Sequence, residues 1–349
     1  MPEPVKLRFG AELEVVTGSR SQSQKDWQAV ATLLSQELAA AGIKNHVNAE
    51  HKDKGESYQE WSLVQEVTIA DQKKQNRWGM ELVSPILDFQ QPEIWNSHLD
   101  NVWWVLEKRL QTNTSVECST HIHISPQTGQ WTLGQLKNIA KGALYFERSI
   151  DSLLPPDRRA NMWCQSNRWN KTFKGESMAT AFNWIDGVDS TWHLIFLMCS
   201  FSKNSELGQA TGAKQDFTPN VFRWNFTPLS EVAKGTIEFR QAPGSGNAAQ
   251  SKLWVQFVAA FIQAAILYAG SLNPESPPSL ELLRTHLLAG AQSSGVQDRS
   301  LLESLFVGRT QLAPGPYGVK SFDRDDVMKL KKKAAEKNIS LAKFKKLYG

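Results

Sequence analysis

Apolar and polar residues alternate along residues 5–16, as they do in a β-strand with one face buried. The same period predicts further strands, which are residues 57–69, 78–87, 116–125, 220–229 and 235–243. Elsewhere apolar residues recur at helical spacing. The predicted helices are residues 25–42, 92–112, 132–154 and 251–270. Residues 157–189, rich in Trp, Arg and Asn, are predicted to be irregular.

Helices interrupt the predicted strands without forming regular βαβ units. This order favours an α+β fold with a largely antiparallel sheet. The stretch "NPESPPS" at 273–279 has the composition of a linker. We therefore predict a main domain over residues 1–270 and a helical C-terminal extension over residues 271–349.

The chain has 349 residues and a net charge of +4, but this charge is unevenly distributed. Residues 320–349 carry ten Lys or Arg and four Asp or Glu, so this tail is basic and the rest of the chain is slightly acidic. The tail is predicted to be a basic helix that is solvated or contacts a partner. Nothing in the rest of the chain indicates nucleic acid as a partner.

Three widely spaced cysteines and the lack of an 18-residue apolar run predict a cytoplasmic protein without a membrane span.

Glutamate is depleted in β-strands, yet it recurs on the polar faces of several predicted strands here. Glu12 and Glu14 share one face of the first strand, about 7 Å apart, and repel each other unless a cation lies between them. His121 and His123 share one face of the segment "VECSTHIHIS". Charged residues on the other predicted strands include Glu66, Glu81, Glu238 and Arg240.

These polar faces have a structural explanation and a functional one. An antiparallel sheet can simply expose one face to water. If the strands pair, however, the face gathers about five carboxylates and two imidazoles, a set that suits Mg²⁺ or Mn²⁺. Several cations beside an arginine suit a polyphosphate such as ATP. The sequence has neither a Walker loop nor a G-x-G-x-x-G motif, so metals and side chains would hold the nucleotide.

Two other classes of function stay open from the residues alone. A His-x-His pair also occurs in metal-dependent hydrolases of the barrel type, which need further His and Asp ligands. A non-catalytic nucleotide-binding or scaffold protein would use the same surface without turnover.

Seven short segments occur in an order and at spacings that resemble the amidoligase family. They are "FGAELE", "EWSLVQEVTI", "MELVSP", "CSTHIHIS", "PPDRRANMWC", "RWNF" and "GTIEFR". The resemblance covers roughly residues 7–268. That family is a branch of the carboxylate–amine ligases related to glutamine synthetase and glutamate–cysteine ligase.

The resemblance implies a curved antiparallel sheet that binds ATP and Mg²⁺ or Mn²⁺ on its concave face, with helices on the convex side. It implies ligation: ATP phosphorylates a carboxylate, an amine attacks the acyl phosphate, and an amide forms. The carboxylate and the amine, a small molecule or a peptide, are not named by the sequence. Relatives of this fold are often homo-oligomers.

The resemblance also implies roles for particular residues. One ion is expected among Glu14, Glu66 and Glu81, and a second among Glu12, His121 and Glu238. The catalytic residues are expected to be Arg240, Glu66 and His123. The residues expected near the nucleotide or substrate are His123, Arg240, Arg159, Arg223 and Asn225.

Two positions depart from the family's pattern. Glu66 stands where the family often has aspartate, and Ser119 stands where it usually has glycine, just before the two histidines.

Overall fold

The computed structural model describes residues 3–49, 58–66, 68–230, 235–314 and 327–328. The chain forms a mixed α/β structure with a largely antiparallel, open sheet, and it divides into two compact units. Unit 1 contains residues 1–6, 125–241 and 256–349, and unit 2 contains residues 7–124 and 242–255. Residues 271–314 thus belong to the same unit as residues 256–270, and the proposed boundary after residue 270 stays a prediction.

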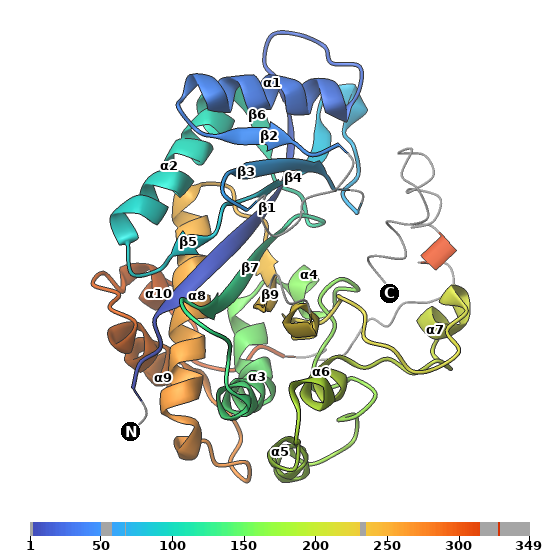
Figure 1. Cartoon of the computed structure of the whole chain (residues 1–349), viewed down its shortest axis with the longest axis vertical. Helices are drawn as coiled ribbons and strands as arrows, with labels where there is room; N and C mark the ends of the chain where they lie inside the picture. The colour runs from blue at the N-terminus through green and yellow to red at the C-terminus, as the bar shows by residue number, and fades with distance from the viewer. Residues whose placement is uncertain (1–2, 50–57, 67, 231–234, 315–326, 329–349) are drawn as a thin grey trace. The chain divides into compact units, whose positions relative to one another are not determined.

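Unit 2 is built around the long strand β1, which lies between β4 and β7 in the strand order β2-β3-β4-β1-β7 (Figure 1). β1 pairs antiparallel with β4, β5 and β6, and β2 pairs parallel with β3. The strands of this unit are β1 (Leu7–Ser19), β2 (Asn45–Val47), β3 (Trp61–Gln65), β4 (Trp78–Val83), β5 (Leu87–Asp88), β6 (Leu110–Asn113) and β7 (Ser119–Pro126), of which β7 continues into unit 1.

The apolar face of β1 is covered by the helices of unit 2. Helix α1 (Trp27–Ala40) buries its apolar stripe against the strands, and α2 (Pro92–Lys108) places Trp95 against Phe9 of β1, with ring centroids 5.8 Å apart. Phe9 and Leu13, on that face, are almost fully buried. The predicted alternation of β1 is therefore confirmed, and its glutamates lie on the face away from these helices.

Unit 1 is mainly helical, and its core is aromatic. Trp224 of the short strand β8 (Trp224–Asn225) packs against Phe239 of β9 (Ile237–Pro243) and Phe261 of α8 (Ala248–Leu267), each with ring centroids 4.7 Å apart. The other named helices in the described part of this unit are α3 (Leu133–Leu153), α4 (Pro156–Arg159), α5 (Met178–Asp186), α6 (Thr191–Cys199), α7 (Glu206–Thr211), α9 (Leu280–Ser293) and α10 (Ser300–Ser304). Among the described residues, the short 3₁₀ helices are η2 (Lys73–Gln75), η3 (Thr227–Ser230) and η4 (Ala269–Ser271).

Three predicted elements differ from the structure. The helix predicted over residues 92–112 ends at Lys108, and residues 110–113 form β6, because they pair antiparallel with residues 16–19 at the C-terminal end of β1. The strand predicted over 220–229 contains only the two residues of β8 before the η3 turn. The segment predicted to be irregular contains α5, whose N-cap Ser177 was the overlooked signal. The tail over residues 320–349, predicted to be a basic helix, lies almost wholly outside the described residues.

α8 is long and apolar enough to span a membrane, but most of it is buried inside the protein. That burial is typical of the core helix of a folded domain. The three cysteines are buried and free.

A buried histidine in unit 1 predicts sensitivity to acid. His286 of α9 packs against Phe146 and Phe261 at ring distances of 4.8 and 6.0 Å, and its Nε2 has no hydrogen-bond partner in the described part of the chain. Burial lowers the pKa of His286 to about 4. Because the folded state disfavours the proton, stability is full above the unfolded pKa of about 6.5 and is lost as the pH falls toward 4.

We expect the buried His286 to lower the free energy of unfolding by about 2–3 kcal/mol when the pH falls from 7.5 to 4.5. Urea unfolding at both pH values measures that loss, and His286→Leu should lose less stability than the wild type over the same interval. The exposed His193, changed to Gln, serves as the control and should behave as the wild type does. An equal acid loss in the wild type and His286→Leu would contradict the prediction.

Candidate functional site

Strand register brings two glutamates of unit 2 face to face. Glu14 of β1 lies directly opposite Glu81 of β4, and Glu81 also faces Val64 of β3. Glu66 follows immediately after the end of β3. Glu14, Glu66 and Glu81 each offer an oxygen, and these atoms lie within 4.8 Å of one another. Three carboxylates at that separation repel strongly unless positive charge lies among them.

A second group forms beside the first. Glu12 contacts both histidines: its Oε2 lies 3.0 Å from His121 Nδ1, and its Oε1 lies 3.1 Å from His123 Nε2. Burial would raise the pKa of the Glu12 carboxyl, but His123 and His121 outweigh it and hold the pKa well below its ordinary value. Glu12 is therefore an anion at neutral pH, as a metal ligand must be.

Glu81 connects the two groups, because Glu12, Glu81 and His121 also offer ligand atoms within 4.8 Å of one another. The donors are mostly carboxylate oxygens, with imidazole as the minority. Mg²⁺ and Mn²⁺ prefer such donors, whereas structural zinc sites use more nitrogen or sulfur. The residues of unit 2 thus fit hard divalent cations.

Unit 1 holds the predicted site residues that lie later in the chain, which are Arg159, Arg223, Asn225, Glu238 and Arg240. Asn225 lies opposite Glu238 in the β8–β9 pair, and its Nδ2 donates to Glu238 Oε2 at 2.8 Å. The other oxygen of Glu238 is paired with Arg240 Nη1, and Arg240 Nε donates to the carbonyl of Trp163. Asn225 thus orients Glu238, and Arg240 neutralises it.

Arg223, predicted to lie near the nucleotide, is only 1 % exposed. Its Nη1 lies 2.8 Å from Asp151 and 3.3 Å from Glu147, both on α3, and its Nη2 donates to the carbonyl of Arg159. Burial raises the pKa of Asp151 to about 6, against the opposing effect of Arg223. The Arg223 guanidinium therefore has a structural role as the partner of two buried carboxylates. Its contact with a nucleotide stays a prediction, which its burial and these ion pairs do not favour.

Arg159, the other arginine predicted to lie near substrate, is half-buried. Its Nε and Nη2 both donate to the carbonyl of Leu154 at the end of α3. Its role toward a ligand also stays a prediction.

The acidic partners of Arg223 were missed from the sequence. Glu147 and Asp151 stand four residues apart on the predicted helix 132–154, among apolar residues of its buried side. Two acids on an apolar helix face indicate a buried cation, and this was the available signal.

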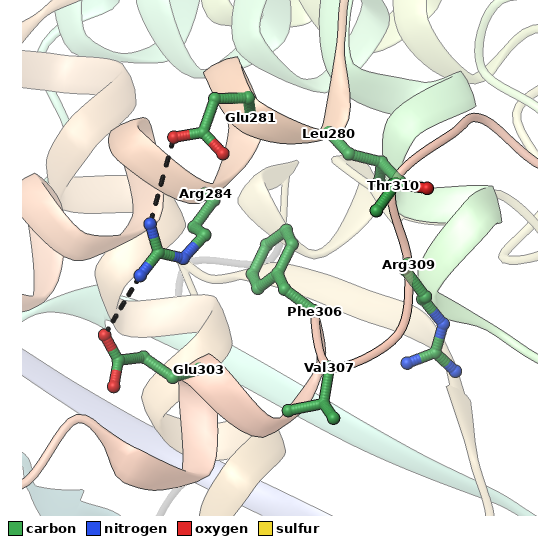
Figure 2. Close-up of a pocket in the computed structure, with 8 residues that line it drawn as sticks. All are labelled: Leu280, Glu281, Arg284, Glu303, Phe306, Val307, Arg309 and Thr310. Atoms are coloured by element: carbon green, nitrogen blue, oxygen red, sulfur yellow. Dashed lines mark hydrogen bonds and ion pairs between the residues drawn. The ribbon is translucent and has the colours of Figure 1, made fainter.

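A separate pocket of about 500 Å³ lies beside α9 and α10 in unit 1 (Figure 2). Arg284 is held between Glu281 and Glu303, at 3.8 and 3.3 Å, and Phe306 and Arg309 also line the pocket. None of the residues predicted to bind metal, nucleotide or substrate lines this pocket.

Comparison with known protein families adds one finding. A model of a family described as "putative amidoligase enzyme" matches residues 5–262, about three quarters of the chain. A search of the curated proteins finds no match.

Proposed function

Because this chain belongs to the amidoligase family, we propose that it is an ATP-dependent carboxylate–amine ligase that forms an amide through an acyl phosphate. The observation that carries the proposal is the convergence of four glutamates and two histidines on one face of unit 2. The catalytic fold is proposed to be of the glutamine synthetase type.

The carboxylates of unit 2 would hold Mg²⁺ or Mn²⁺. In this proposal Glu14, Glu66 and Glu81 hold one cation, while Glu12 and His121 hold another, with Glu81 shared. Bound cations would neutralise the phosphoryl oxygens of ATP and the acceptor carboxylate. His123, held by Glu12, would donate a hydrogen bond to a phosphate oxygen.

The sequence resemblance assigns Glu238 to the second cation and Arg240 to the transferred phosphoryl group. The guanidinium would stabilise negative charge that develops in transfer. Its ion pair with Glu238 and its bond to the Trp163 carbonyl fix its orientation in unit 1. Asn225 acts through Glu238 as a positioning residue.

The hydrolase alternative lacks support among the described residues. Their candidate metal groups contain His121 and His123 and no other histidine. His46 pairs with Glu60, and His286 is buried among aromatic rings. Zinc retained by the purified protein would favour the hydrolase instead.

The three free cysteines and the absence of disulfides among the described residues suit a reducing compartment, so we propose that the enzyme works in the cytoplasm. The partners proposed for it are its carboxylate and amine substrates, a second copy of the chain, and a contact for the basic tail.

The deciding experiment is a screen of carboxylate–amine pairs for ADP release, with mass spectrometry of the product. We expect Mg²⁺- or Mn²⁺-dependent ADP release and a product lighter by one water than the two substrates together. ADP release without a condensed product would identify an ATPase. Nucleotide binding without turnover across a broad screen would identify the scaffold alternative.

A further inference from the structure

Ser119, the first residue of β7, lies at the centre of the carboxylate and histidine face, although no cation role was predicted for it. The residue is 4 % exposed. Its Oγ donates to Glu14 Oε2 at 2.6 Å and lies 2.7 Å from His121 Nε2. Its backbone N–H donates to the same oxygen of Glu14 at 2.7 Å.

The two donors of Ser119 fix the orientation of Glu14. Hydrogen bonds to a carboxylate are short and strong, and two of them from one residue hold Oε2 in place. The oxygen that we assign to a cation is therefore Oε1, which would act together with Glu66 and Glu81. Held in this way, Glu14 would bind a cation through one oxygen.

The same hydroxyl fixes the ring of His121. One ring nitrogen, Nε2, faces Ser119, and the other, Nδ1, faces Glu12. The single proton of the Ser119 hydroxyl goes to Glu14, so His121 Nε2–H donates to Ser119 Oγ, and Nδ1 is the nitrogen that would bind a cation beside Glu12. Ser119 therefore joins the group of Glu14, Glu66 and Glu81 to the group of Glu12, Glu81 and His121.

We propose that Ser119 is a positioning residue for divalent cations, acting through Glu14 and His121. This inference rests on the proposed function, because it presumes that the glutamates bind metal. Residues that support metal ligands typically contribute 10–100-fold to metal affinity. A hydroxyl at position 119 should thus be needed for tight binding, although it is not itself a ligand.

The test measures the affinity of the full chain for Mn²⁺. Electron paramagnetic resonance of the free Mn²⁺ and isothermal titration calorimetry both report this affinity. We expect Ser119→Ala to weaken Mn²⁺ binding at least about tenfold. Ser119→Gly should weaken it similarly, since both variants keep the backbone donor and lose Oγ. Ser119→Thr keeps a hydroxyl and should restore most of the affinity.

The matched control is Thr120→Val. Thr120 is the next residue of β7, and its side chain points to the opposite face of the strand from Ser119. The substitution removes a buried hydroxyl contact with Ser245 at 2.7 Å. It should bind Mn²⁺ as the wild type does, even if its melting temperature falls.

The outcomes separate the two ideas. Wild-type affinity in Ser119→Ala and Ser119→Gly would overturn the role of Ser119 and leave the proposed function standing. An absence of Mn²⁺ binding in the wild-type protein would instead overturn the proposed function. If Ser119→Thr fails to fold, as judged by circular dichroism, the comparison of Ser119→Ala with Thr120→Val still decides.

Discussion

Glu81→Gln is expected to abolish metal-dependent ATP turnover while the chain stays folded. Glu81 is shared by two candidate cation groups, so its loss affects both. The substitution keeps the size of the side chain and removes one negative charge. Residues that merely support ligands contribute 10–100-fold, so loss of a shared ligand should lower turnover at least about 100-fold. ADP release at saturating Mg²⁺ or Mn²⁺ measures the effect.

The same variant carries an opposite expectation for stability. Without divalent cations, Glu81→Gln removes repulsion with Glu14 and Glu66, so its melting temperature should equal or exceed that of the wild type. With Mn²⁺ at 100 times its dissociation constant, the wild type should gain about 2.7 kcal/mol, and the variant should gain much less. Thermal unfolding with and without Mn²⁺ checks both expectations.

Glu60→Gln is the control for Glu81→Gln. Glu60 stands beside the start of β3 and pairs with His46 at 2.7 Å, outside the candidate cation groups of the described residues. It should keep its ATP turnover and its response to Mn²⁺. Full turnover in Glu81→Gln would refute the assignment of the site.

Arg223→Met is expected to destabilise the protein by about 3–5 kcal/mol, the usual cost of removing one partner from a buried ion pair. The substitution leaves Asp151 and Glu147 buried without their shared cation. Typical domains are stable by about 5–15 kcal/mol, so this loss is large. Urea unfolding, followed by both tryptophan fluorescence and circular dichroism, measures it.

Two companion variants distinguish a structural arginine from one that binds nucleotide. Arg159→Met removes a side chain whose guanidinium donates to the Leu154 carbonyl, and the substitution should cost less than about 1 kcal/mol. Combining Arg223→Met with Asp151→Asn and Glu147→Gln should recover part of the lost stability, because no buried charge is left uncompensated. If Arg223→Met keeps wild-type stability but loses ATP binding, the predicted nucleotide contact is correct and the structural role is wrong.

The alternation of the strands was readable from the sequence because successive side chains of a strand point to opposite faces. It correctly placed Glu12 and Glu14 on the face opposite Phe9 and Leu13. The spacing of apolar residues likewise located α1, α2 and α3, since it depends on neighbours three or four residues away, although the prediction for α2 ran past its end at Lys108. The amidoligase family was also recognisable, because its motifs are short and local in the chain.

Tertiary structure decided what depends on pairing between distant segments. The register that sets Glu14 opposite Glu81 joins residues 67 positions apart, and nothing local in either strand specifies it. Only the folded chain brings Asp151 and Glu147 to Arg223, and the predicted contact of Arg223 with a nucleotide stays a prediction. In the sequence Ser119 was only a departure from the family's motif. The folded sheet brings its hydroxyl to both Glu14 and His121, and these contacts could not be read from the motif. Sequence thus determined which side chains face together, and long-range pairing determined which of them touch.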